Sequence, residues 1–597
     1  MVDRSFAIQA VPVSPGIAIG KVSVHEGTPA LLRAYPITAA QVDLEIERLQ
    51  QALEKARQQI LELRDEVAEH ASERDALIFD AHVEILKDPV LVRDVKRRME
   101  KDLVNVETVL MSWFDDYEAL FKSSDHEVMK QRVGDLRDVC HRLLRALLQH
   151  EEDLGPAADG DYVLAAYELF PSMTVGLDKE HLRGIVTERG GNVSHAAILA
   201  RSYGIPAVTG VEGIRCRLRA GDTVVMDGRT GKLFVNPEEK VLEKYRRAHS
   251  QLEALRNRLS GCVHEECRTT DGERVQLTIN VERASDLNRL DVETIDGVGL
   301  FRTEFIFMEH GRFPSEEEQY EVYRGLAEKL GGRELVVRTL DIGDDKRLPY
   351  LQFPSESNPA LGWRGLRVSF EWPDLFIVQI RALLRASVHG PLKILLPMVT
   401  TLEEVRHAKS LIASLKQDLT AQGLPFDADT PLGIMVEVPA VAWAIDDFLE
   451  EVDFVSVGTN DLVQYLMAVD RNNAKVSRLY QTFHPAVLNT MRHVLRACHL
   501  HQKDVTVCGE MGGNVASVLM LLGLGLRRFS VSPFYVVPVK SLIRSLSIQQ
   551  AEEIVEKALT MRTGTEIAEL FETEVLNIVS ELEGYFGTVE MSSTPKV

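Results

Sequence analysis

The sequence lacks the segments that would place a protein in a membrane or send it out of the cell. It has no run of about 18 uncharged apolar residues, the length that crosses a bilayer. Its opening residues, MVDRSFAIQAVPVSPG, put Asp3 and Arg4 before a very short apolar run that Pro12 interrupts, which is unlike a secretory signal peptide. We therefore expect no membrane insertion and a cytoplasmic location.

Paired cysteines are also lacking. The six cysteines form no CxxC pair and are scattered at Cys140, Cys216, Cys262, Cys267, Cys498 and Cys508. This distribution is typical of a reducing compartment. The run from Cys262 to Cys267 could be interpreted as a metal-binding knuckle, but its spacing differs from the common zinc motifs, and a surface linker is the favoured interpretation.

The chain has fewer basic than acidic residues. Lys and Arg number 68 against 90 Asp and Glu, which gives a formal net charge of −22. Such a charge repels nucleic acid phosphates and attracts a basic protein partner. We therefore expect no nucleic acid partner, and any bound anion must be held by a local cluster of arginines.

The length of 597 residues predicts two to four domains. A long helix with a narrow apolar seam is predicted over 42–67, because apolar residues recur there at steps of three and four. The seam residues are Ile46, Leu49, Leu53, Ala56, Ile60, Leu63 and Val67. Further amphipathic stretches near 72–88, 90–104, 106–123 and 126–149 complete a predicted helical bundle over 37–149.

A compact α/β domain is predicted around this bundle. Short β-rich runs occur at 162–169 and 184–188, and the segment 223–235 has the pattern of a hairpin. The segment 18–25 would supply an opening strand, so that residues 1–36 and 150–236 form one domain and the bundle is an insertion. The charged stretch 237–260 is predicted to be a connecting helix.

The region 261–584 alternates eight apolar β-rich runs with helical patterns, which predicts a (β/α)8 TIM barrel. The runs are VQLTINV, GVGLFR, LVVRTL, ILLPMV, GIMVEV, FVSVG, VTVCGE and RFSVS. A polar tail is expected over 585–597. The fold class is therefore a multidomain α/β protein that ends in a TIM barrel.

Charged residues follow several of these runs, at the end of the barrel where active sites lie. They are Arg302, Glu304, Arg338, Asp341, Glu437, Asn460, Asp461, Cys508 and Glu510, with Arg471 elsewhere in the same region. Each alone could be a surface ion pair, but together they point to a polyanion and a divalent cation. Glu437 and Asp461 offer oxygen ligands suited to Mg²⁺, and arginines bind carboxylate and phosphate. A small phosphorylated carboxylic acid fits both.

A second candidate site surrounds His195. The stretch from Gly190 to Arg201, GGNVSHAAILAR, follows a β-rich run and leads into an apolar helical run. His195 therefore lies near a helix N-terminus, which favours an anion such as a phosphorylated imidazole. From spacing alone, a capping Ser194 beside a helix-start histidine is slightly favoured.

Several motifs, in order, resemble those of the phosphoenolpyruvate-utilising family, and closely those of Enzyme I of the bacterial sugar phosphotransferase system. GGNVSHAAILAR looks like its phosphohistidine motif. GLFRTEF, VRTLDIG, NPALGWR, MVEVPA, SVGTNDLVQY and CGEMGG resemble its barrel motifs, and DLRDVCHRLL resembles its helical region. The likeness extends from about residue 14 to the last barrel helices and is highly specific.

The resemblance implies that His195 is phosphorylated through Nε2 and swings between the barrel and the bundle, where the carrier protein HPr docks. It implies that phosphoenolpyruvate is bound by Arg302, Arg338, Asn460, Asp461 and Arg471. It makes Glu437 and Asp461 the Mg²⁺ ligands and Cys508 the acid that protonates the enolate carbon. A homodimer through the barrel is also implied.

The chain departs from the family pattern at four positions. Val193 and Phe170 replace hydroxyl residues expected near the imidazole, Asp344 replaces a usual glycine, and Asn514 replaces an acid after CGEMGG. Two alternatives stay open. One is an enzyme like phosphoenolpyruvate synthase or pyruvate phosphate dikinase, which also needs an ATP-binding domain. The other is a regulatory phosphorelay paralogue that has lost turnover.

Overall fold

The computed structural model of the protein describes residues 5–14, 16–25, 34–70, 79, 82–123, 127–148, 161–169, 177, 181–189, 200, 205–211, 213–260, 265–289, 291–308, 312–343, 348, 350–351, 356–471, 473, 476 and 479–579. The chain divides into two compact units, Met1–Ser250 and Gln251–Val597. Each unit has its own apolar cores. His195 and the predicted polar tail lie outside the described residues.

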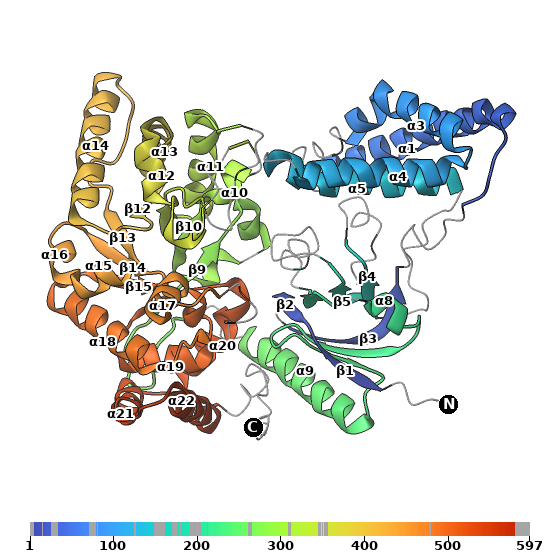
Figure 1. Cartoon of the computed structure of the whole chain (residues 1–597). Helices are drawn as coiled ribbons and strands as arrows, with labels where there is room; N and C mark the ends of the chain where they lie inside the picture. The colour runs from blue at the N-terminus through green and yellow to red at the C-terminus, as the bar shows by residue number, and fades with distance from the viewer. Residues whose placement is uncertain are drawn as a thin grey trace. The chain divides into compact units, whose positions relative to one another are not determined.

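The first unit contains the predicted helical bundle (Figure 1). Its helices are α1 Val42–His70, α3 Pro89–Asp102, α4 Val106–Ser123 and α5 Glu127–Leu148. The predicted seam faces the bundle core, since Ile46, Leu49, Ala56 and Ile60 are buried and Leu53 packs against them. The predicted helix near 72–88 is described only at residue 79 and over 82–88, and residues 82–87 are helical.

An eight-stranded mixed sheet forms the rest of the first unit, in the order β1-β8-β7-β3-β4-β5-β6-β2. Its strands are β1 Phe6–Gln9, β2 Val11–Ser14, β3 Ile17–Val24, β4 Tyr162–Ala166, β5 Leu182–Thr187, β6 Ala207–Thr209, β7 Thr223–Asp227 and β8 Lys232–Val235. A short helix, α8 Ile214–Arg217, follows β6. The bundle is inserted between β3 and β4, which pair in parallel, as predicted.

The second unit is built on a closed barrel of eight parallel strands. The strands coincide with the eight apolar runs: β9 Gln276–Val281, β10 Gly297–Arg302, β11 Glu334–Arg338, β12 Leu392–Leu396, β13 Leu432–Val436, β14 Phe454–Val457, β15 Asp504–Val507 and β16 Arg528–Val531. The prediction of a TIM barrel is confirmed. The predicted connecting helix is α9 Glu239–Ser260, and the division between the two units falls within it.

Helices surround this barrel, and the core lies between them and the strands. They are α10 Glu304–Met308, α11 Glu316–Lys329, α12 Leu366–Glu371, α13 Pro373–Ala386, α14 Leu402–Ala421, α15 Pro439–Trp443, α16 Ile445–Leu449, α17 Thr459–Met467, α18 Pro485–Leu500, α19 Val515–Gly523, α20 Val536–Arg544, α21 Ile548–Ala558 and α22 Gly564–Ile578. The exact domain boundaries given above stay a prediction. Across the described ranges, no helix is long and apolar enough to span a membrane.

Candidate active site

The carboxyl ends of the barrel strands bring several of the predicted barrel-site residues to one rim. Arg302 and Arg338 are the last residues of β10 and β11, and they lie opposite each other in the strand register. Glu437 directly follows β13, and Cys508 directly follows β15. Because all the strands are parallel, their carboxyl ends meet at the same edge.

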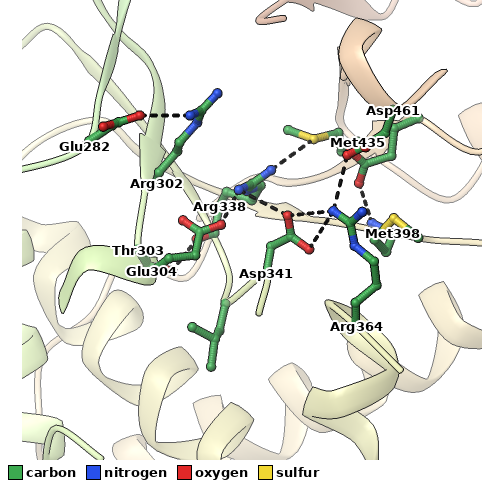
Figure 2. Close-up of polar contacts among 12 residues, drawn as sticks. Glu282, Arg302, Thr303, Glu304, Arg338, Asp341, Arg364, Met398, Met435 and Asp461 are labelled. Atoms are coloured by element: carbon green, nitrogen blue, oxygen red, sulfur yellow. Dashed lines mark hydrogen bonds and ion pairs between the residues drawn. The ribbon is translucent and has the colours of Figure 1, made fainter. Parts of the chain in front are cut away.

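Arg338 is buried in a network of opposite charges, which Figure 2 shows. Its Nη2 donates to a carboxylate oxygen of Glu304 and lies 3.2 Å from Oδ2 of Asp341. Its Nη1 donates to the sulfur of Met435 at 3.7 Å. Burial alone would lower the pKa of Arg338, but the neighbouring carboxylates outweigh it and raise the pKa above its usual value. The guanidinium therefore stays charged inside the barrel.

A second buried arginine, Arg364, continues this network. Its Nη2 lies 3.2 Å from Oδ2 of Asp341 and 3.2 Å from Oδ2 of Asp461 (Figure 2). Its Nη1 donates to the Tyr465 hydroxyl at 3.3 Å. Sequence reasoning did not assign this residue to the site. The signal was present, because Arg364 ends the NPALGWR motif. It comes from the loop region after β11 and not from a strand end, so strand spacing could not place it.

The environment of Glu437 disfavours the charged form of its carboxyl group. Its side chain is buried, and its Oε1 accepts a hydrogen bond of 2.6 Å from the backbone N–H of Met398. Burial and the nearby charges of Asp461 and Asp341 raise the pKa of Glu437 to about 8, although Arg338 and Arg364 act in the opposite direction. A neighbouring cation would relieve this repulsion.

The two predicted metal ligands, Glu437 and Asp461, fit a hard divalent cation. The described residues contain no cluster of three potential metal-binding side chains. Magnesium, however, is commonly held by one or two carboxylates together with water and substrate phosphate oxygens. Burial raises the pKa of Glu437 most, and the neighbouring carboxylates of Asp461 and Asp341 raise it further. This gathering of buried carboxylates around Glu437 supports a cation at this position.

Asn460 links two loops of the rim. Its Nδ2 donates to Oε1 of Glu510 at 3.0 Å, and its Oδ1 accepts from the backbone N–H of Glu510 at 2.8 Å. Both ends of the Asn460 amide therefore hold the loop that follows Cys508. Arg471 lies between β14 and β15, and its side chain interacts with Tyr480, whose hydroxyl donates to the Asn460 carbonyl at 3.3 Å.

Cys508 is buried at the top of the barrel interior. Its sulfur accepts a hydrogen bond from the Ser456 hydroxyl at 3.2 Å and donates to the Val457 carbonyl at 3.5 Å. Burial raises the pKa of the Cys508 thiol above its usual value, so the thiol keeps its proton at neutral pH. Such a thiol can act as an acid.

Arg302 lies at the more exposed side of the rim. Its Nη1 forms an ion pair of 2.9 Å with Oε1 of Glu282, and about a third of each side chain is exposed, 31% and 37%. Figure 2 shows this pair beside the Arg338 network. Sequence reasoning did not assign Glu282, although it follows the first apolar run directly.

The remaining predicted features fall mostly outside the described part of the chain. His195, Val193, Phe170 and Asp344 are not among the described residues. Asn514, the fourth departure, is the N-cap of α19, and its Oδ1 accepts from the Ser517 N–H at 2.9 Å. An aspartate can cap a helix in the same way, so this departure preserves the local structure.

Family models match three stretches of the chain. "PEP-utilising enzyme, PEP-binding domain" matches residues 256–548, which include the barrel site. "PEP-utilising enzyme, N-terminal" matches residues 9–132, and "PEP-utilising enzyme, mobile domain" matches residues 158–231, which include His195.

Curated relatives extend over nearly the whole chain. "Phosphoenolpyruvate-protein phosphotransferase" of Geobacillus stearothermophilus is 40% identical over 94% of this chain and 97% of its own length. The protein of the same name from Bacillus subtilis (strain 168) is 38% identical over 94% of this chain and 98% of its own length. A solution structure described as Enzyme I (nEIt) is 32% identical, covers 41% of this chain and 99% of its own, and has a TM-score of 0.35.

Proposed function

Because the chain belongs to the family of phosphoenolpyruvate-protein phosphotransferases, we propose that it transfers the phosphoryl group of phosphoenolpyruvate to His195 and then to the carrier protein HPr. The observation that carries this proposal is the buried chain of ion pairs through Arg338, Asp341, Arg364 and Asp461. Buried arginines held at the barrel rim by fixed carboxylates suit a small ligand that carries both phosphate and carboxylate.

The substrate would be bound by Arg302, Arg338, Asn460, Asp461 and Arg471. Arg338 needs no reorganisation to meet an anion, because Glu304 and Asp341 already fix its guanidinium. Fixed charges at the position of the reacting group are the largest contribution to phosphoryl transfer. The arrangement therefore favours positioning and electrostatic stabilisation as the basis of catalysis.

The family works with a divalent cation, and we propose Mg²⁺ held by Glu437 and Asp461. When bound, it would neutralise negative charge on the phosphoryl oxygens. Asp461 contacts Arg364 directly, and the charges of Arg338 and Arg364 also act on Glu437.

The reaction needs one acceptor and one acid. Nε2 of His195 would form a bond to phosphorus as the bond between phosphorus and the enol oxygen breaks. The enolate that leaves would take a proton at its carbon from the Cys508 thiol, which gives pyruvate. The buried, protonated state of this thiol supports the second step.

The phosphoryl group on His195 would then pass to the histidine of HPr, docked on the helical bundle of residues 37–149. The partner is implied by the family, and the negative net charge of −22 favours a basic protein. We further propose that the protein works in the cytoplasm as a homodimer through the barrel.

Arg338→Gln tests the barrel site. Because the variant removes a fixed cation from the site, pyruvate release from phosphoenolpyruvate with Mg²⁺ should fall about 100-fold or more. Arg406→Gln is the control. Arg406 forms an exposed ion pair with Glu451, and Glu451 lies shortly before the start of β14, at the end of the barrel opposite the site. If Arg338→Gln folds normally and keeps the wild-type rate, the barrel site is misassigned.

A further inference from the structure

The Glu282 carboxylate forms an ion pair with Arg302, one of the proposed substrate ligands. It directly follows β9, and Arg302 ends the neighbouring strand β10, so the two side chains emerge side by side at the rim. The Glu282 carboxylate accepts from Nη1 of Arg302 at 2.9 Å. An anionic substrate that binds Arg302 must compete with this carboxylate.

The local backbone holds Glu282 in that position. Oδ2 of Asp286 accepts hydrogen bonds from the backbone N–H groups of Glu282, at 3.2 Å, and of Arg283, at 2.9 Å. The loop after β9 is therefore fixed by its own side chain, and Glu282 is presented to Arg302 without a contribution from the substrate.

The Arg302–Glu282 pair differs from the two buried arginine sites of the rim. Arg338 and Arg364 are buried and each contacts two carboxylates. The Arg302 pair is partly exposed, and Nε of Arg302 has no hydrogen-bond partner among the described residues. A partly exposed ion pair is weak, so a ligand anion can replace it at low cost. The buried ion pairs of Arg338 and Arg364 instead stay formed and fix the positions of these two guanidinium groups.

We propose that Glu282 is an affinity-setting residue that competes with phosphoenolpyruvate for Arg302. Its carboxylate holds the guanidinium in the free protein and leaves it when the substrate arrives. The residue therefore sets the KM for phosphoenolpyruvate and leaves kcat unchanged, because it has no role once the substrate is bound. This proposal rests on the proposed function, which makes Arg302 a substrate ligand.

Glu282→Gln tests the competition, because it removes the charge and keeps the shape. We expect KM for phosphoenolpyruvate in the pyruvate-release assay to fall about two- to fivefold, the size expected for a partly exposed ion pair. The kcat should stay within about twofold. Glu451→Gln makes the same charge change in the Arg406–Glu451 ion pair, far from the strand ends of the site. It should leave both KM and kcat unchanged.

A double-mutant cycle with Arg302→Gln separates competition from a long-range charge effect. In the Arg302→Gln background, Glu282→Gln should no longer lower KM. An equal decrease in both backgrounds, an unchanged KM or a raised KM in Glu282→Gln overturns the proposal. If Arg302→Gln alone leaves KM and kcat at wild-type values, Arg302 is not a substrate ligand, and that part of the proposed function fails instead.

Discussion

Two buried guanidinium groups, those of Arg338 and Arg364, face four carboxyl groups at the barrel rim, those of Glu304, Asp341, Glu437 and Asp461. The cluster has more acids than arginines, and this excess contributes to the high pKa of Glu437. A divalent cation balances this excess, whereas a proton on Glu437 only reduces it. Protonation of Glu437 and cation binding to its carboxylate should therefore exclude each other.

Because of this charge balance, the stability of the metal-free protein should depend on pH. The pKa of Glu437 rises from 4.5 to about 8 on folding, so the folded state binds this proton more tightly than the unfolded state. The free energy of unfolding should therefore fall as pH rises between about 5 and 8. Glu437→Gln removes this titration, so thermal melts at pH 6 and pH 9 without metal should differ less than in the wild type.

Glu451→Gln is the control for this experiment. Glu451 pairs with Arg406 and Lys409, and these partners lower the pKa of its carboxyl. Its replacement should leave the pH dependence between pH 6 and pH 9 as in the wild type. If Glu437→Gln has the wild-type pH dependence of stability, the assignment of this titration to Glu437 is wrong.

Cys508→Ser should separate the two half-reactions. A serine hydroxyl is a much weaker acid than a thiol, whose ordinary pKa is about 8.5, so pyruvate formation should slow strongly. In the proposed mechanism, phosphoryl exchange between His195 and HPr does not use the barrel, so it should stay nearly normal. Both rates and the melting temperature would be measured on one preparation. A stable variant with unchanged pyruvate formation would remove Cys508 from the mechanism.

Most of the residues that the sequence places at the barrel site lie at the end of a predicted strand or directly after it. Arg302, Arg338, Glu437 and Cys508 could be found in this way because parallel strands in a barrel end at one rim. Arg364 could not, because it reaches the rim from a long connection after β11. The ion pairs that decide the charge balance were not predictable, since they depend on side-chain directions across different strands.

At the scale of elements, long periodic segments were predicted well and edge strands were not. The strands β1 and β2 are the two edges of the mixed sheet, and the pairing of Ala7 with Phe234 joins distant parts of the chain. Edge strands are short and only half covered, so they carry weak patterns, and an edge tolerates Pro12. The central strand β3 was predictable because it is more apolar and more buried.

The seam of α1 offers a test with an internal control. Leu49 is fully buried in the bundle core, whereas Leu44 on the same helix is 59% exposed. Leu49→Ala should cost about 2–5 kcal/mol of bundle stability, because it leaves a cavity. Leu44→Ala should change stability by less than about 0.5 kcal/mol. Urea unfolding monitored by circular dichroism checks both, and similar effects of the two variants would contradict the seam.

In the whole molecule, the two units have different proposed roles in the reaction. The proposed substrate ligands lie in Gln251–Val597, whereas His195 and the helical bundle lie in Met1–Ser250. Residues 1–260, expressed alone, should therefore accept phosphate from phosphorylated HPr and not from phosphoenolpyruvate. Labelling of this fragment with each donor checks the division. Direct labelling of the fragment by phosphoenolpyruvate would place a substrate site in the first unit and contradict this division.

The central claim is that one histidine carries the phosphoryl group between these units. The most direct test is incubation of the full chain with labelled phosphoenolpyruvate and Mg²⁺, followed by HPr, in the wild type and in His195→Ala. We expect the wild type to become labelled and to pass the label to HPr, while a folded His195→Ala protein takes up none. Normal labelling of His195→Ala would contradict it.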